Sequence, residues 1–381
     1  MNSSSCNTMS ENKNNLPLHD PDEAWRILSQ TQPFLPIPTT TAAHNPMKST
    51  RISCMSDTHG KHRKVFIPKC DVLIHGGDFT KSGEQLIIKD LADFFAETVQ
   101  EGRTKKVICI AGNHDISFHP ECCHRNWGRF HPMSTITKMD DAMKSKIYLK
   151  ERCTYLEDES ITENNIHFHG SPWSPTFCNR WAFMKSRDTI HSQWDLIPNE
   201  TDVLVTHGPP LGRGDKVQFG KRAGCLNLLG QVQDRIKPRL HVFGHIHEDK
   251  GCTFDGDTLY VNASNCTIRY KPEQPCIVVD LPHDVREPAR FVVPNCVLAG
   301  NDVLNWLKMH GYDKIYPYFE NRKPLLDGSE LVCDEGDLLV ENLACKLKMH
   351  SFKVPLQVPV NWRDLQEELT MAMLHLRNES Y

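Results

Sequence analysis

Short, nearly all-apolar runs alternate with turns and amphipathic stretches between Arg51 and about Leu281. Runs of this kind are typical of strands buried on both faces of a layered α/β domain. They predict strands at 51–55, 72–75, 107–111, 166–169, 203–206, 241–243, 259–262 and 276–280. The segment 85–99 instead has apolar positions at helical spacing. We expect its apolar face to comprise Leu86, Leu91, Phe94 and Phe95.

The segments on either side of this pattern differ from it. Residues 1–48 are poor in apolar periodicity and rich in Pro, Ser, Thr and Asn, so we expect disorder there, apart from a short docking helix at 25–28. The domain itself is expected at 49–283. A Pro-containing stretch at 284–300 reads as a linker or an extra edge segment, and 301–381 as a mainly helical extension.

Composition narrows the function classes. The chain has 39% hydrophobic and 24% charged residues, and 44 Lys and Arg stand against 48 Asp and Glu, for a net charge of −4. This balance argues against general binding to nucleic acid or to an anionic membrane. The sequence has neither a membrane-spanning apolar run nor a signal-peptide pattern, so we expect a cytoplasmic protein. Its 15 cysteines, an odd number without Cys-x-x-Cys spacing, are expected to be reduced.

The number of histidines, 20, is more unusual than the number of cysteines. Several of these histidines follow predicted strands, together with carboxylates. Ligands of layered α/β proteins bind outside the carboxyl ends of the strands, so we expect these clusters to meet. Each motif alone has an ordinary explanation as a turn, a cap or a buried histidine. In an extended chain, positions two apart point the same way, which favours paired ligands in the first and last motifs. The five clusters are Asp57-Thr58-His59, Gly76-Gly77-Asp78, Gly112-Asn113-His114-Asp115, His207 and Gly244-His245-Ile246-His247.

The order of these motifs resembles the calcineurin-like metallophosphoesterase superfamily. The stretches 70–80, 170–183, 206–212 and 238–248 are similar to the metallophosphoesterase-domain-containing branch, which is related to class III cyclic nucleotide phosphodiesterases. The resemblance covers about 51–281 and implies a four-layer α/β/β/α sandwich with two metal ions at one end. It implies one ion held by Asp57, His59 and His247, a second held by Asn113, His207 and His245, Asp78 bridging them, His114 facing the phosphate, and Asp115 orienting His114.

The implied chemistry is attack on phosphorus by a hydroxide shared between the two ions. A mixed His, Asp and Asn ligand set suits Mn²⁺ first, with Fe or Zn²⁺ as alternatives. Protein serine/threonine phosphatases of the superfamily carry Gly-Asp-x-Val-Asp-Arg-Gly, whereas this chain has Gly77-Asp78-Phe79-Thr80-Lys81. We therefore expect a phosphodiesterase for a small phosphodiester, for which a cyclic nucleotide is a plausible substrate.

Two regions leave alternatives open. Trp173, Phe177 and Trp181 either pack a loop onto the sandwich or stack on a substrate base, and Gly208 could shape the opposite wall. The tail at 301–381 resembles a sterile alpha motif in part, which implies self-association or a protein partner; it could equally be a helical extension packed on the core. A second function class is a weakly active nucleotide-binding scaffold that acts through this tail.

Overall fold

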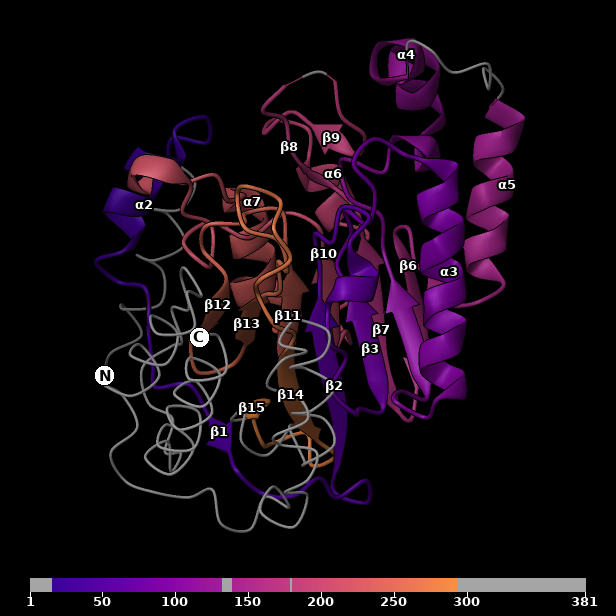
Figure 1. The fold of residues 1–381 in the computed structure, drawn as a ribbon. Helices are drawn as coiled ribbons and strands as arrows, with labels where there is room; N and C mark the ends of the chain where they lie inside the picture. Colours follow the sequence, from indigo (N-terminus) through magenta and orange to yellow (C-terminus); the bar gives the residue numbers. More distant parts are fainter. Residues whose placement is uncertain (1–15, 132–138, 179, 293–381) are drawn as a thin grey trace, which may run out of the picture.

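The computed structural model describes residues 16–131, 139–178 and 180–292 (Figure 1). The first 15 residues and the predicted helical extension at 301–381 lie outside the described residues, as does the second part of the predicted linker, from 293 to 300. The described part contains two large β-sheets with helices on their outer sides.

The first sheet has seven strands in the order β1-β15-β14-β2-β3-β4-β5. The second has six strands in the order β12-β13-β11-β10-β7-β6. The strands of the first sheet are β1 (Thr39–Thr40), β2 (Ser49–Met55), β3 (Val72–His75), β4 (Lys106–Cys109), β5 (Thr154–Tyr155), β14 (Ile277–Pro282) and β15 (Arg290–Val292). Those of the second are β6 (Glu159–Glu163), β7 (Ile166–Ser171), β10 (Val203–Thr206), β11 (Leu240–Phe243), β12 (Gly251–Phe254) and β13 (Leu259–Asn262), and a small third sheet pairs β8 (Ser174–Pro175) with β9 (Met184–Lys185).

Helices form the outer layers. In Figure 1, α3 and α5 lie side by side along one edge of the molecule. Residues of α3 and α4 pack with the first sheet, and residues around α6 and α7 pack with the second. The helices are α2 (Pro21–Leu28), α3 (Gln85–Gln100), α4 (Pro120–Phe130), α5 (Met139–Lys150), α6 (His191–Trp194) and α7 (Leu226–Gly230).

Alternate side chains along a single strand point into different cores, which shows the order of the layers. On β3, Val72 and Ile74 enter the core between the sheets, whereas Leu73 joins the core beneath the helices. On β10, Val203 and Val205 likewise face the other sheet, and Leu204 faces the helical layer. Because successive side chains of a strand point to opposite faces, strands covered on both sides are largely apolar. The expected α/β/β/α sandwich is confirmed.

All eight predicted strands are present, with ends shifted by a few residues. The strand β6 was missed because its sequence Glu-Ser-Ile-Thr-Glu carries no apolar run, as suits an edge strand with exposed positions. The predicted apolar face of α3 was wrong at Leu86, which is 82% exposed. The buried face begins instead at Ile88 and continues through Leu91 and Phe95, one turn apart each time.

The N-terminal segment differs from the predicted disorder over its described part. The predicted docking helix is present but begins earlier, at Pro21, where the carboxylate of Asp20 accepts a 3.0 Å hydrogen bond from the N–H of Glu23. Ala24 and Leu28 are buried in a small cluster with Leu211. Apolar residues too few to form a core of their own can still pack on a surface that the domain provides. Further on, β15 at Arg290–Val292 lies between β1 and β14, so these residues are part of the first sheet.

Two other expectations concern the described residues. Their cysteines are all free thiols, as predicted. Within 16–131, 139–178 and 180–292, no helix combines the length and apolarity that crossing a membrane requires.

Candidate metal centre

The polar motifs lie at the carboxyl ends of strands from both sheets, and these ends are close together. The strands β2, β3 and β4 run parallel in one sheet, and β10 and β11 run parallel in the other. A parallel bridge between Ser56, just after β2, and Ser264, just after β13, joins the two sheets beside the site. The side chains gathered here are Asp57, His59, Asp78, Asn113, His114, His207, His245 and His247.

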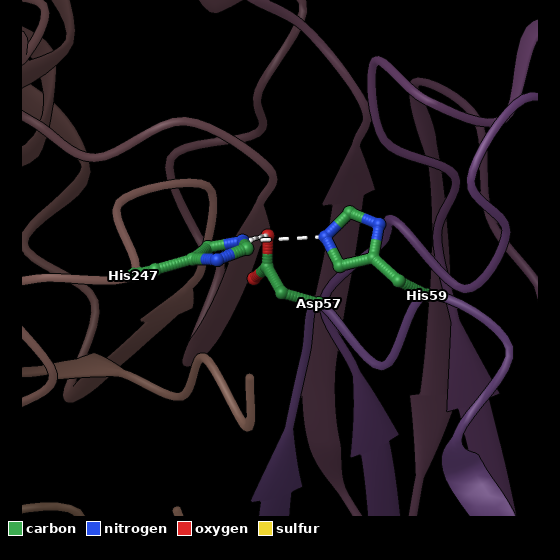
Figure 2. A group of neighbouring side chains, drawn as sticks. All are labelled: Asp57, His59 and His247. Carbon is green, nitrogen blue, oxygen red and sulfur yellow. Dashed lines mark hydrogen bonds and ion pairs between the residues drawn. The ribbon is translucent and has the colours of Figure 1, made fainter. Parts of the chain in front are cut away.

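One group of potential ligands consists of Asp57, His59 and His247, whose donor atoms all lie within 4.8 Å of one another (Figure 2). His247 Nε2 is 3.3 Å from Asp57 Oδ1 and 3.2 Å from His59 Nε2. Figure 2 shows both imidazoles directed toward the carboxylate between them. The predicted first ligand set is therefore brought together.

A second group consists of Asp78, His207 and His245. His207 Nε2 is 3.4 Å from Asp78 Oδ1 and 2.9 Å from Asn113 Oδ1. The imidazoles of His207 and His245 have centroids 5.0 Å apart. The predicted second set, with Asn113 included, is brought together as well.

Asp78 connects the two groups. Besides its contact with His207, its Oδ2 lies 3.9 Å from His59 Nε2 and 3.9 Å from His114 Nε2. The side chain is almost completely buried. A carboxylate with imidazoles of both groups around it is suited to hold two cations near each other.

The backbone that aims these ligands is not extended, contrary to the reasoning from alternate positions. Asp57, His59 and His245 have φ values of 55°, 45° and 69°, in the left-handed region that histidine seldom adopts. His245 and His247 consequently belong to different groups. The N–H of His245 donates to both carboxylate oxygens of Asp57, at 3.0 and 2.9 Å, which helps to hold this conformation.

Three imidazoles share one pattern of orientation. The Nδ1 atoms of His59, His207 and His247 donate hydrogen bonds to the carbonyls of Thr80, Gly76 and Thr267 at 3.0, 2.9 and 3.1 Å. A carbonyl only accepts, so each Nδ1 carries a proton, and each Nε2, when it is unprotonated, presents a lone pair to the site. Two such lone pairs, on His59 and His247, lie 3.2 Å apart. They repel unless a proton or a metal ion lies near both, so the donor set fits a bound cation.

The charges of the site are consistent with this fit. Burial lowers the pKa of His59 to about 4 and that of His245 to about 3, so both are neutral near pH 7. Burial opposes ionisation of Asp78, but the charges of His207 and His114 outweigh it and hold the pKa of Asp78 well below its usual value. For His207, burial is in turn outweighed by Asp78, which raises its pKa to about 9. The buried, ionised carboxylate of Asp78 is therefore stable only with positive charge beside it.

The expected role of Asp115 requires a correction. Its carboxylate accepts hydrogen bonds from the backbone N–H groups of Asp78 and Gly112, at 2.9 and 2.8 Å, and a hydrogen bond of 2.7 Å from Thr80 Oγ1. The Nδ1 of His114 instead donates to the carbonyl of Lys81, at 2.6 Å. Asp115 therefore fixes the loops that carry Asp78 and His114, and a backbone carbonyl orients the imidazole.

Two of the predicted substrate-binding residues flank the site. The indole of Trp181 lies against the imidazole of His114, with centroids 3.9 Å apart. Phe177 is 59% exposed, and its ring centroid is 5.5 Å from that of His245. Both rings come from the segment between β8 and β9 and its flanks.

The other two have packing roles. Trp173 Nε1 donates a 2.8 Å hydrogen bond to Asp158, and its ring contacts the cores on both outer sides. Gly208 is buried, and a Cβ there would lie 2.8 Å from Ser174 Cβ. For these two residues the structure agrees with the packing alternative.

Sequence reasoning missed Tyr270. Its ring centroid is 4.7 Å from that of His59 and 5.6 Å from that of His247. Tyr270 stands in a turn well after the last histidine motif, with no pattern that connects it to the site. The fold of the segment after β13 brings it there.

Comparison with known proteins identifies this architecture. Residues 50–249 match the family model of the calcineurin-like phosphoesterases. The chain belongs to this family. Its members are metal-dependent hydrolases of phosphate esters, with a dinuclear site for divalent ions that the His and Asp groups described above fit.

Curated relatives are similar to the chain over most of its phosphoesterase domain. Metallophosphoesterase domain-containing protein 1 of Homo sapiens is 41% identical over 244 residues, which cover 63% of this chain and 73% of the human one. UPF0046 protein T07D4.2 of Caenorhabditis elegans is 34% identical over 278 residues, covering 69% and 68% of the two chains. Among solved structures, a novel archaeal phosphodiesterase aligns with 15% identity and a TM-score of 0.29, over 63% of this chain and 98% of that one. The family assignment does not rest on this last alignment.

Proposed function

We propose that this calcineurin-like phosphoesterase is a two-metal phosphodiesterase that acts on a small phosphodiester. The observation that supports it best is the buried carboxylate of Asp78, which lies within 3.4 to 3.9 Å of imidazoles from both ligand groups. The proposed ligands are Asp57, His59 and His247 for one ion, and Asn113, His207 and His245 for the other, with Asp78 shared.

The donor chemistry favours particular metals. Imidazole, carboxylate and amide donors together suit Mn²⁺, Fe or Zn²⁺ better than the oxygen-only shells of Mg²⁺ and Ca²⁺, and we take Mn²⁺ as the first metal to test. Two bound ions would lower the pKa of a water and neutralise charge on the phosphate oxygens. The proposed compartment is the cytoplasm, where the free thiols of the described residues would stay reduced.

His114 is the proposed proton donor to the leaving oxygen. Its Nδ1 is held by the Lys81 carbonyl, and its Nε2 lies 3.9 Å from Asp78 on the side of the ligand groups. The ring can thus release a proton from Nε2 while its orientation stays fixed. A positioned acid of this kind typically contributes about 10²–10⁴ in rate.

Phe177 is the proposed platform for the organic part of the substrate. Its exposed ring stands beside His245, one of the proposed ligands. Stacking of a nucleobase on an aromatic ring contributes roughly 1–3 kcal/mol. This favours a substrate with a flat ring, such as a cyclic nucleotide.

A substrate panel on Mn²⁺-reconstituted protein tests the proposal. It comprises 2′,3′- and 3′,5′-cyclic nucleotides, bis(4-nitrophenyl) phosphate and the monoester 4-nitrophenyl phosphate. We expect turnover of the diesters, and a loss of about tenfold in kcat/KM for a cyclic nucleotide in Phe177→Ala. The matched control is Phe219→Ala, because Phe219 is 97% exposed and belongs to none of the described hydrophobic clusters. Turnover of the monoester alone would contradict the proposal.

A further inference from the structure

Tyr270 forms a wall of the site on the side of Asp57, His59 and His247. Its ring stands nearly edge-on to the imidazoles of His59 and His247, at interplanar angles of 81° and 84°. The ring of His114 is somewhat farther away, with its centroid at 6.3 Å. The side chain stays 38% exposed, so one part of it faces imidazoles and another part faces solvent at the mouth of the site.

The turn that carries Tyr270 is tied to the ligands. The N–H of Tyr270 donates to the carbonyl of Thr267 at 2.7 Å, and the same carbonyl accepts from Nδ1 of His247 at 3.1 Å. On the other side, Lys61 Nζ donates to the carbonyl of Tyr270. The position of the aromatic ring is therefore fixed relative to both His247 and the loop that follows His59.

This fixed position includes an unfavourable backbone conformation. Tyr270 has a φ of 56°, in the left-handed region that bulky residues avoid. Conformations of this kind persist when the surroundings impose them, and they concentrate at functional sites. The aromatic partners of the ring are the imidazoles at the proposed metal centre. Its place at the site mouth points to contact with a ligand.

The two exposed aromatic rings differ in which ligand group they accompany. Phe177 lies beside His245, in the group with His207, whereas Tyr270 lies beside His59 and His247. Asp78 is shared by both groups. Each of the two ligand groups that share Asp78 therefore has one aromatic ring beside it. A phosphodiester has two organic groups to place, and a monoester has one.

We propose that Tyr270 contacts the second organic group of the substrate and so makes the site selective for phosphodiesters over phosphomonoesters. This inference rests on the proposed function and adds a specificity-determining residue to it. The contact is assigned to the aromatic ring rather than to the hydroxyl, because the ring is the part of Tyr270 that lies beside the imidazoles.

Two substitutions separate the ring from its hydroxyl. In Tyr270→Ala, we expect kcat/KM for bis(4-nitrophenyl) phosphate to fall about tenfold, as loss of one stacking contact predicts, while kcat/KM for 4-nitrophenyl phosphate changes by less than about threefold. Tyr270→Phe should keep diester turnover within about threefold of wild type. Phe219→Ala serves as the exposed-aromatic control.

Binding and metal content supply readouts beyond turnover. Bis(4-nitrophenyl) phosphorothioate, titrated calorimetrically into the Mn²⁺-loaded protein, should bind about tenfold more weakly to Tyr270→Ala than to wild type. Bound metal per chain and melting temperature should stay at wild-type values.

The inference is overturned if Tyr270→Ala reduces monoester and diester turnover equally, loses metal, or leaves diester turnover unchanged. An equal loss in Tyr270→Phe would also overturn it, because the hydroxyl rather than the ring would then make the contact. Failure of the proposed function looks different: the wild-type protein itself would bind metal and hydrolyse no diester.

Discussion

The indole of Trp181 covers the imidazole of His114, with centroids 3.9 Å apart and planes inclined by 31°. Phe130, the last residue of α4, stacks on Trp181 at 4.8 Å. The Lys81 carbonyl holds the Nδ1 edge of the same imidazole. The ring of His114 is thus fixed on one face and one edge, while its Nε2 is left for chemistry at the metal centre.

Replacing His114 should separate proton donation from metal binding. In His114→Ala, we expect turnover to fall by about 10²–10⁴ for a cyclic nucleotide, whose ribose oxygen leaves poorly without a proton. The loss should be smaller for bis(4-nitrophenyl) phosphate, since nitrophenolate departs unprotonated. The metal content and the turnover rates for the two substrates distinguish proton donation from metal binding. Equal losses on both substrates together with lost metal would show that His114 is a ligand instead.

Asp78→Asn should be among the most damaging substitutions at the site. Asparagine keeps the shape of the side chain but removes the charge that both ligand groups share, so bound metal and turnover should fall together. Metal content by mass spectrometry and diester turnover measure this. Asp257→Asn is the matched control, because Asp257 is exposed and forms an ion pair with the exposed Lys237. Full activity without bound metal would refute the two-metal mechanism.

The N-terminal helix should contribute to stability through Trp25. Its ring fills the space beside Gly212, where a Cβ would lie 1.9 Å from the indole, and it packs against the guanidinium of Arg222 at 4.8 Å. We expect Trp25→Ala to lower the free energy of unfolding by about 2 kcal/mol in urea denaturation. Ile27→Ala, on an exposed part of α2, should change it by less than about 0.5 kcal/mol. Equal effects of the two substitutions would mean that the helix does not dock through Trp25.

Stability should fall in mild acid, partly through His241. Burial lowers the pKa of His241 in the folded state to about 3, whereas an unfolded histidine has a pKa of about 6.5. Below that value the unfolded state takes up a proton that the folded state does not, so stability is lost as pH falls from 6.5 toward 3. The expected loss at pH 5 is about 2 kcal/mol for this one group.

His241→Gln should remove that part of the acid sensitivity. Urea denaturation at pH 7.5 and pH 5.0 would show a smaller loss than in wild type, while His191→Gln, at an exposed position, would behave as wild type. If the difference between the two pH values is the same in His241→Gln and wild type, the assignment to His241 fails.

Removing the chain after residue 300 should leave the phosphoesterase domain folded. The last described strand, β15, ends at Val292, and every proposed ligand precedes it. We expect unchanged metal content and diester turnover, and a changed mass by size-exclusion chromatography with light scattering if the tail mediates self-association. An insoluble or inactive truncation would show that the tail completes the core.

The sequence by itself determined the eight strands that form apolar runs, and it pointed to the eight residues of the proposed metal centre. Strands buried on both faces are largely apolar, so most of them are visible as runs, and the residues just after parallel strands of one sheet meet at one edge of that sheet. This is why Asp57 and Asp78, which follow neighbouring parallel strands of one sheet, could be placed together from the sequence. His207 follows a strand of the other sheet, and the family resemblance implied its place beside them.

Only the tertiary structure decided how side chains in loops and helices are used. Whether an aromatic ring packs or lines the site depends on what lies next to it in space, so Trp173 and Phe177, four positions apart, have different roles. The same holds for Asp115, whose carboxylate is taken by backbone N–H groups, and for Tyr270, which a turn far along the chain brings to the metal centre. Contacts between segments distant in sequence produce no periodic pattern or fixed spacing within either segment. They depend on the shape and chemistry of both surfaces, which form only when the chain folds.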